Sequence, residues 1–136
     1  MDSIGQQFIK QTKHSNLGPS DQSSGKPQPP IQLEYDKSQP VVKLPKPSEI
    51  ITEFVDVRTV IEQRKSIRRY SNIPLTMDQL SYLLWCTQGV KEVFQGTATL
   101  RNVPSAGARH VFETYLLINN VDGITPGLYK YFKIPS

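Results

Sequence analysis

The stretch IEQRKSIRRY, residues 61–70, crowds four cations and a hydroxyl into a few positions. Arg64, Ser66 and Arg68 stand at alternating positions, and alternating side chains of an extended segment face the same side. Guanidinium groups bind phosphate through paired hydrogen bonds, so these three residues would suit an anionic ligand. Lys65 would then face elsewhere. The alternative interpretation of such a cluster is solvated surface charge.

A second motif, PSAGARH at residues 104–110, is a turn of small residues. Side chains of little bulk let a flat ligand approach the backbone, whose amides could reach the ligand's edge. The residues with little side-chain bulk are Ser105, Ala106, Gly107 and Ala108. The alternative is an ordinary tight loop that opens a short helix.

Two helices precede the second motif. Asp56 is a good N-cap for a helix over residues 57–65, with Val57, Val60 and Ile61 on one apolar stripe. Its last turn would contain Arg64 and Lys65, which would there complement the helix dipole.

The second helix is predicted over residues 77–88. Thr76 and Gln79 have the spacing of a capping box, and Gly89 would end the helix in a left-handed conformation. Leu80, Leu83, Leu84 and Thr87 follow helical spacing. We expect Trp85 and Cys86 to be buried in the core, and the alternative for Trp85 is that it covers the ligand site.

Residues 91–102 are predicted to form a loop that carries Phe94. After the second motif, residues 112–119 and 128–132 are rich in aromatic and aliphatic side chains, which predicts two strands. The connection between them contains turn signals, so an antiparallel hairpin is expected.

Residues 1–50 differ in composition from residues 51–136, and we expect an arm followed by a domain. A short helix with Ile4, Phe8 and Ile9 on one side would end at Gly18-Pro19. The proline, serine and glutamine that follow predict an extended arm lying along a surface, with disorder as the alternative.

Composition excludes several classes. The single cysteine of the 136 residues excludes an internal disulfide and a multi-cysteine zinc site. A net charge of +4 concentrated at one site-sized cluster favours a small anion over a nucleic acid. Apolar runs are too short for a secretory signal or a membrane span, so we expect a soluble, cytoplasmic protein.

From residue 57 to residue 132 the sequence resembles the nitroreductase superfamily, and within it the SagB/ThcOx-type (thiazole or azoline) dehydrogenases. The resemblance rests on the order of four motifs: RKSIR, a capped helix with LLW and QG, PSAGA, and GLYKY. Such proteins are longer, so the chain is expected to represent the N-terminal part of one, with an incomplete α+β fold.

The resemblance implies a homodimer that binds flavin mononucleotide (FMN) at the subunit interface. Arg64, Ser66 and Arg68 match the phosphate and ring-edge contacts. Pro104, Ser105 and Ala106 match the loop that contacts the flavin, typically from the other subunit, and Gly107 falls within the same motif. His110 stands where relatives carry histidine followed by proline, and here Val111 replaces that proline.

The implied activity is flavin-mediated hydride transfer, with no residue that is a clear general base. The substrate would be a small molecule reduced at the expense of NAD(P)H, or a heterocycle in a peptide that is oxidised. The alternative is a truncated, non-catalytic remnant that serves only in binding or dimerisation.

Overall fold

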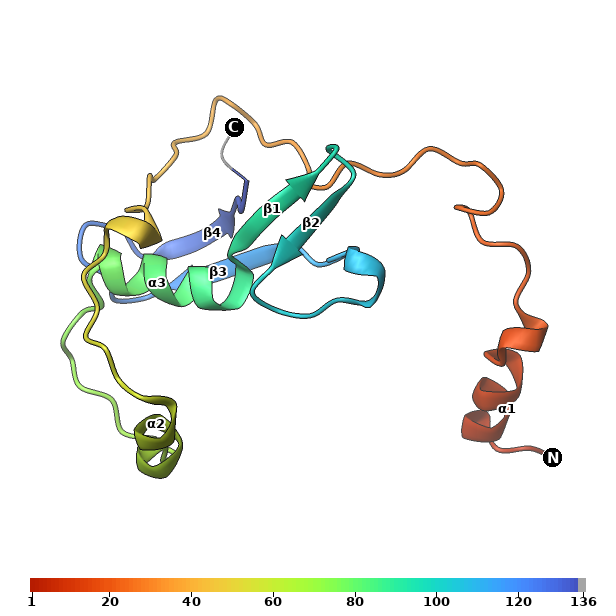
Figure 1. Ribbon diagram of the computed structural model, residues 1–136, viewed down its shortest axis with the longest axis horizontal. Coiled ribbons are helices and arrows are strands. Elements are labelled where there is room, and N and C mark those ends of the chain that lie inside the picture. The colour runs from red at the N-terminus through yellow and green to blue at the C-terminus, as the bar shows by residue number, and fades with distance from the viewer. Residues whose placement is uncertain (135–136) are drawn as a thin grey trace. The chain divides into compact units, whose positions relative to one another are not determined.

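The computed structural model describes residues 1–134, and the longest element in it is the helix α3, Met77–Gln88 (Figure 1). The Thr76 hydroxyl accepts a hydrogen bond from the Gln79 backbone N–H at 3.2 Å, and the Gln79 side chain accepts one from the Thr76 N–H at 3.0 Å. The predicted capping box is therefore confirmed, and it fixes where α3 begins.

The end of α3 differs from the prediction. Gly89 has φ −55° and ψ 128°, so it is not left-handed. A Cβ atom on Gly89 would lie 2.5 Å from the Trp85 carbonyl oxygen and 2.6 Å from Asn102 Nδ2. Glycine is needed here because the strand that follows leaves the helix in close contact with it.

The core lies between α3 and a hairpin of β3, Thr114–Ile118, and β4, Gly127–Tyr131. The strands pair antiparallel, as predicted, with Leu116 opposite Tyr129 and Ile118 opposite Gly127. The buried apolar residues are Leu80, Leu84 and Ile118. Partly buried apolar residues pack around them: Leu44, Leu116, Val121, Ile124, Tyr129 and Tyr131.

The prediction of a loop over residues 91–102 is wrong, because this segment forms a second antiparallel hairpin. Its strands are β1, Val90–Phe94, and β2, Ala98–Arg101. Gln95 and Gly96 have φ 47° and 71°, and Thr97 N–H donates to the Phe94 carbonyl at 2.8 Å. Two positive φ values in a tight turn give the twist that joins antiparallel strands.

The helix α2, Val57–Gln63, begins at the predicted N-cap, where Asp56 accepts a hydrogen bond from Thr59 N–H. It ends earlier than predicted, because Arg64 already has extended backbone angles. Its apolar stripe of Val57, Val60 and Ile61 is exposed, so no described residue covers it.

Trp85 and Cys86 are both exposed, which contradicts the prediction that they lie in the core. The ring of Trp85 instead contacts that of Tyr82, with centroids 5.6 Å apart. Only Leu80, Ser81 and Leu84 of α3 are buried, so the hairpin covers a narrower face of the helix than its leucine spacing suggested.

The chain divides into two compact units, residues 1–30 and 31–136. The first contains α1, Ile4–Gln11, which has no buried residue and ends well before Gly18. In the second, the extended segment before α2 follows the domain surface: Ser81 Oγ donates to the Pro45 carbonyl at 2.6 Å, and Gln32 accepts from the backbone of Lys133 and Ile134.

Candidate functional site

The small-residue motif forms a strained loop between β2 and β3. A short 3₁₀ turn, Ala106–Ala108, lies at its centre. Gly107, Ala108 and His110 have φ of 64°, 54° and 44°. Left-handed backbone is costly for alanine and histidine, so the loop needs support to hold this shape.

The Ser105 side chain supplies part of this support. The Ser105 hydroxyl accepts a hydrogen bond from the His110 backbone N–H at 3.0 Å, and the Ser105 backbone carbonyl accepts one from Ala108 N–H at 3.2 Å. Pro104, Ser105, Ala106 and Gly107 are all exposed, as a loop offered to a ligand must be.

Beside the loop lies a cavity of about 290 Å³. Gln88 at the end of α3 and Arg101 at the end of β2 form one part of its lining; the loop and the residues after it contribute Val103, Pro104, Ser105, His110, Val111 and Phe112. The lining therefore combines polar groups with apolar side chains.

Arg101 is a buried cation in this lining, with 9% of its surface exposed. Its Nε donates to the Thr99 hydroxyl at 3.0 Å. Burial lowers the pKa of Arg101, while the charge of Glu113 acts in the opposite direction. Desolvation of a cation is costly, and the partners that offset this cost are the Thr99 hydroxyl and the negative charge of Glu113.

His110 and Lys133 lie within electrostatic reach of Arg101. The pKa of His110 is lowered by burial and then by the charges of Arg101 and Lys133. The pKa of Lys133 is lowered by burial and by Arg101, with Glu113 opposing. Arg101 is thus a cation in the cavity lining, Lys133 is a second cation near it, and Glu113 is the acidic group that opposes them.

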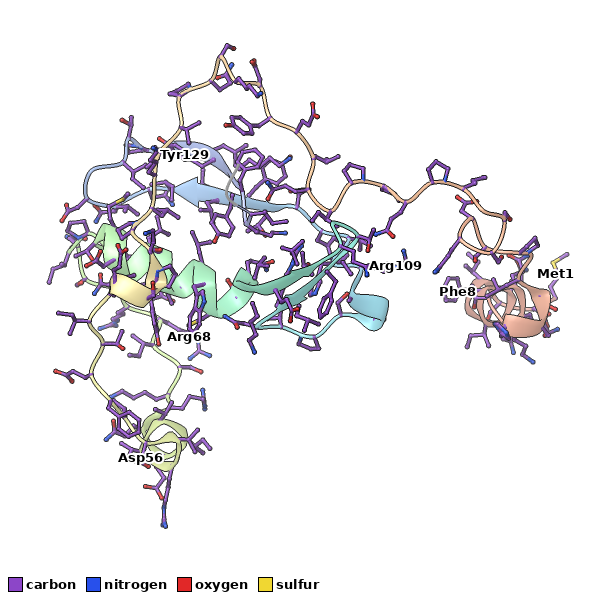
Figure 2. All side chains as sticks on the ribbon, turned by 45° about the horizontal axis from the view of Figure 1, so that its top comes forward. Met1, Phe8, Asp56, Arg68, Arg109 and Tyr129 are labelled. Carbon is purple, nitrogen blue, oxygen red and sulfur yellow. The ribbon has the colours of Figure 1, made fainter. Side chains whose placement is uncertain are left out.

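The arginine motif is placed differently. Arg64, Ser66 and Arg68 are exposed in a segment without regular secondary structure, and within residues 1–134 none of their side chains has a hydrogen bond or ion pair. They do not line the cavity. Figure 2 shows Arg68 well apart from Arg109 of the PSAGARH loop, so the chain does not bring its two motifs together.

Sequence reasoning missed Arg101 and the role of β2 in presenting it. The signal was present in the alternation ATLR, because Thr99 and Arg101 face inward while Leu100 is exposed. Taking residues 91–102 as a loop removed the period of two that would have placed Arg101 on the buried face.

The sequence model of the Nitroreductase family matches residues 61–134, more than half of the chain. The chain therefore belongs to the nitroreductase family. The matched range contains both motifs, and the helices and small antiparallel sheets of the structure are consistent with a partial nitroreductase-like fold.

The chain is also similar to a protein of Methanocaldococcus jannaschii that is named as a nitroreductase. The two are 36% identical over 79 residues, which is 58% of this chain. The chain spans 38% of the length of that relative.

Within residues 1–134, no group of three or more His, Cys, Asp or Glu side chains could hold a metal ion. No helix in the same range is both long and apolar enough to cross a membrane.

Proposed function

We propose that this chain is part of an FMN-dependent oxidoreductase in which two copies form each flavin site. Family membership supports an oxidoreductase, since the matched range includes the arginine motif and the small-residue loop. Arg64, Ser66 and Arg68 of one copy would hold the phosphate and one ring edge. Residues 104–107 of the other copy would contact the ring.

The observation that carries this proposal is the state of the two arginines. Arg64 and Arg68 are exposed on extended backbone, and no carboxylate within residues 1–134 pairs with them. Unpaired guanidinium donors fit a phosphate dianion. The exposed, small and left-handed loop at Gly107 fits a flat ring.

Bound FMN would supply hydride transfer, and this chain's residues would position it and adjust its reactivity. A guanidinium near the ring edge stabilises negative charge there and so favours the reduced form. The substrate would be a nitroaromatic or quinone with NAD(P)H as donor, or, in a SagB-type reaction, an azoline heterocycle of a peptide.

A non-catalytic binding module is the second candidate. The exposed apolar stripe of α2 supports it, because Val57, Val60 and Ile61 offer a surface for association that requires no flavin.

FMN titration of the full chain tests the proposal, with Arg68→Ala and Lys65→Ala as matched variants. Arg68→Ala removes a charge-assisted hydrogen bond and should cost about 1.5–3 kcal/mol of FMN binding free energy, which corresponds to roughly ten- to 150-fold weaker FMN affinity. Lys65→Ala should cost much less, and the contrast should persist at high salt.

Equal losses at both positions that fade with salt would indicate a diffuse cationic surface instead of a built site. A parent chain that associates but binds no FMN would favour the binding module.

A further inference from the structure

The cavity beside the PSAGARH loop has two chemically different parts. Arg101, His110, Ser105 and Gln88 provide hydrogen-bonding groups, whereas Val103, Pro104, Val111 and Phe112 provide apolar surface. A ligand that fills it needs a polar end and an apolar body. The volume of about 290 Å³ leaves room for a body of one ring.

Arg101 decides the charge of the polar end. Its Nε is used by Thr99 Oγ1, and no other hydrogen bond of the guanidinium occurs within residues 1–134. The two terminal guanidinium nitrogens of Arg101 are not fully buried, because no side-chain nitrogen in that range is both fully buried and without a hydrogen-bond partner. The terminal nitrogens therefore keep some accessible surface, and Arg101 is one of the residues that line the cavity.

The nearby charges leave an excess of positive charge. Lys133 Nζ donates to the Phe112 carbonyl at 2.8 Å, which holds a second cation beside the cavity. The carboxylate of Glu113 pairs with Lys130 at 3.6 Å and accepts from the Leu33 N–H, so it is already engaged. Among residues 1–134, no carboxylate lies within 4.0 Å of the charged nitrogens of Arg101 or Lys133.

We propose that this cavity binds a small carboxylate with an apolar body, held by Arg101 through its terminal nitrogens, with His110 and Ser105 as neighbours. A planar carboxylate matches the guanidinium fork, and the apolar wall favours such a ligand over inorganic phosphate. That this carboxylate is a substrate of the oxidoreductase rests on the proposed function, because the loop would also contact the flavin ring. That the cavity binds the carboxylate does not rest on the proposed function.

The experiment uses the full chain without flavin and follows amide and histidine resonances by NMR. Benzoate is the probe. Benzyl alcohol is the neutral analogue, and inorganic phosphate is an anion without an apolar body. Benzoate should shift the His110 resonances saturably, while benzyl alcohol should shift them little and phosphate should bind at least about tenfold more weakly.

Two substitutions remove one positive charge each. Arg101→Met should weaken benzoate binding by about tenfold or more, whereas Lys91→Met, at an exposed position of β1, should change it by less than about threefold. Arg101→Lys keeps the charge and loses the fork, so it should retain only part of the affinity. If Arg101→Met does not fold, Arg101→Lys and the ligand comparison on the parent chain carry the test.

Three results would each overturn the proposal. They are absence of a saturable His110 shift with benzoate, equal binding of benzyl alcohol, and equal losses at Arg101 and Lys91. Phosphate binding tighter than benzoate would reassign the cavity to a phosphate group.

Discussion

Gly89 links the end of α3 to the second hairpin, and its importance is steric. Its carbonyl accepts from Asn102 N–H at 2.9 Å, and Asn102 Nδ2 donates to the Trp85 carbonyl at 2.6 Å. The position has ordinary backbone angles, so a side chain would fail there through overlap and not through an unfavourable φ.

We therefore predict that Gly89→Ala destabilises the second unit by about 1–3 kcal/mol, the usual cost of overpacking. Urea unfolding monitored by Trp85 fluorescence would measure it. Gly127→Ala is the matched control, because its Cβ would meet only Tyr129 Cε2 at an ordinary 3.6 Å. Similar losses at the two glycines would refute the steric explanation.

His110 gives a prediction for pH. Burial, Arg101 and Lys133 lower its pKa below the usual 6.5, and the Thr99 backbone acts in the opposite direction. Below pH 6.5 the unfolded chain thus binds more protons than the folded chain, so stability falls as pH decreases towards the folded pKa. The contribution of neutral His110 to the free energy of unfolding is fully present above pH 6.5.

An NMR titration should show one histidine titrating below 6.5, and His110→Gln should remove that resonance. The same variant should reduce the loss of stability on acidification. His14 is the second histidine of the chain and identifies the remaining signal. If the lower-titrating signal survives in His110→Gln, the assignment of the shift to this loop is wrong.

At the scale of elements, the sequence predicted the local capping interactions of the helices but not the packing between distant segments. Thr76 with Gln79, and Asp56 with Thr59, cap helices through contacts three residues apart, so the sequence predicted both starts. Burial of Trp85 depends on which face of α3 meets the β3–β4 hairpin. That contact is made across distant parts of the chain, and no local pattern specifies its width.

The capping box supports a prediction about α3. Thr76→Ala removes the hydroxyl that accepts from Gln79 N–H and should cost about 0.5–2 kcal/mol of stability. Thr52→Ala is the control, because Thr52 is exposed and its side chain has no hydrogen bond within the described range. Circular dichroism during urea unfolding compares the two, and an equal response would mean that the cap does not limit α3.

At the scale of the whole molecule, the candidate site was predicted only in part. The arginine motif and the small-residue loop were recognised as residue patterns. Their separation in the structure, and the cavity that Arg101 lines beside the loop between β2 and β3, were not predicted. Gln32 and Ile134 hydrogen-bond across 102 positions of sequence, which shows how the extended segment is held by contacts that no local window contains.

The second face of the β3–β4 hairpin carries three exposed apolar side chains. Leu117 and Leu128 are paired across the strands and are each 71% exposed, and Tyr115 beside them is 58% exposed. Adjacent apolar side chains on one sheet face favour association, because burying them removes apolar area from water. We predict that the chain self-associates or aggregates through this face.

Sedimentation velocity over a concentration series measures the association. Leu117→Gln and Leu128→Gln should each shift the distribution towards the monomer without changing the circular dichroism spectrum. Leu100→Gln on β2, where the leucine is 44% exposed, removes a similar side chain from the other hairpin and should leave association unchanged. A parent chain that stays monomeric at every concentration would contradict the prediction, since the apolar pair would then tolerate water. Equal effects of all three substitutions would instead indicate general stickiness, with no preferred surface on β3 and β4.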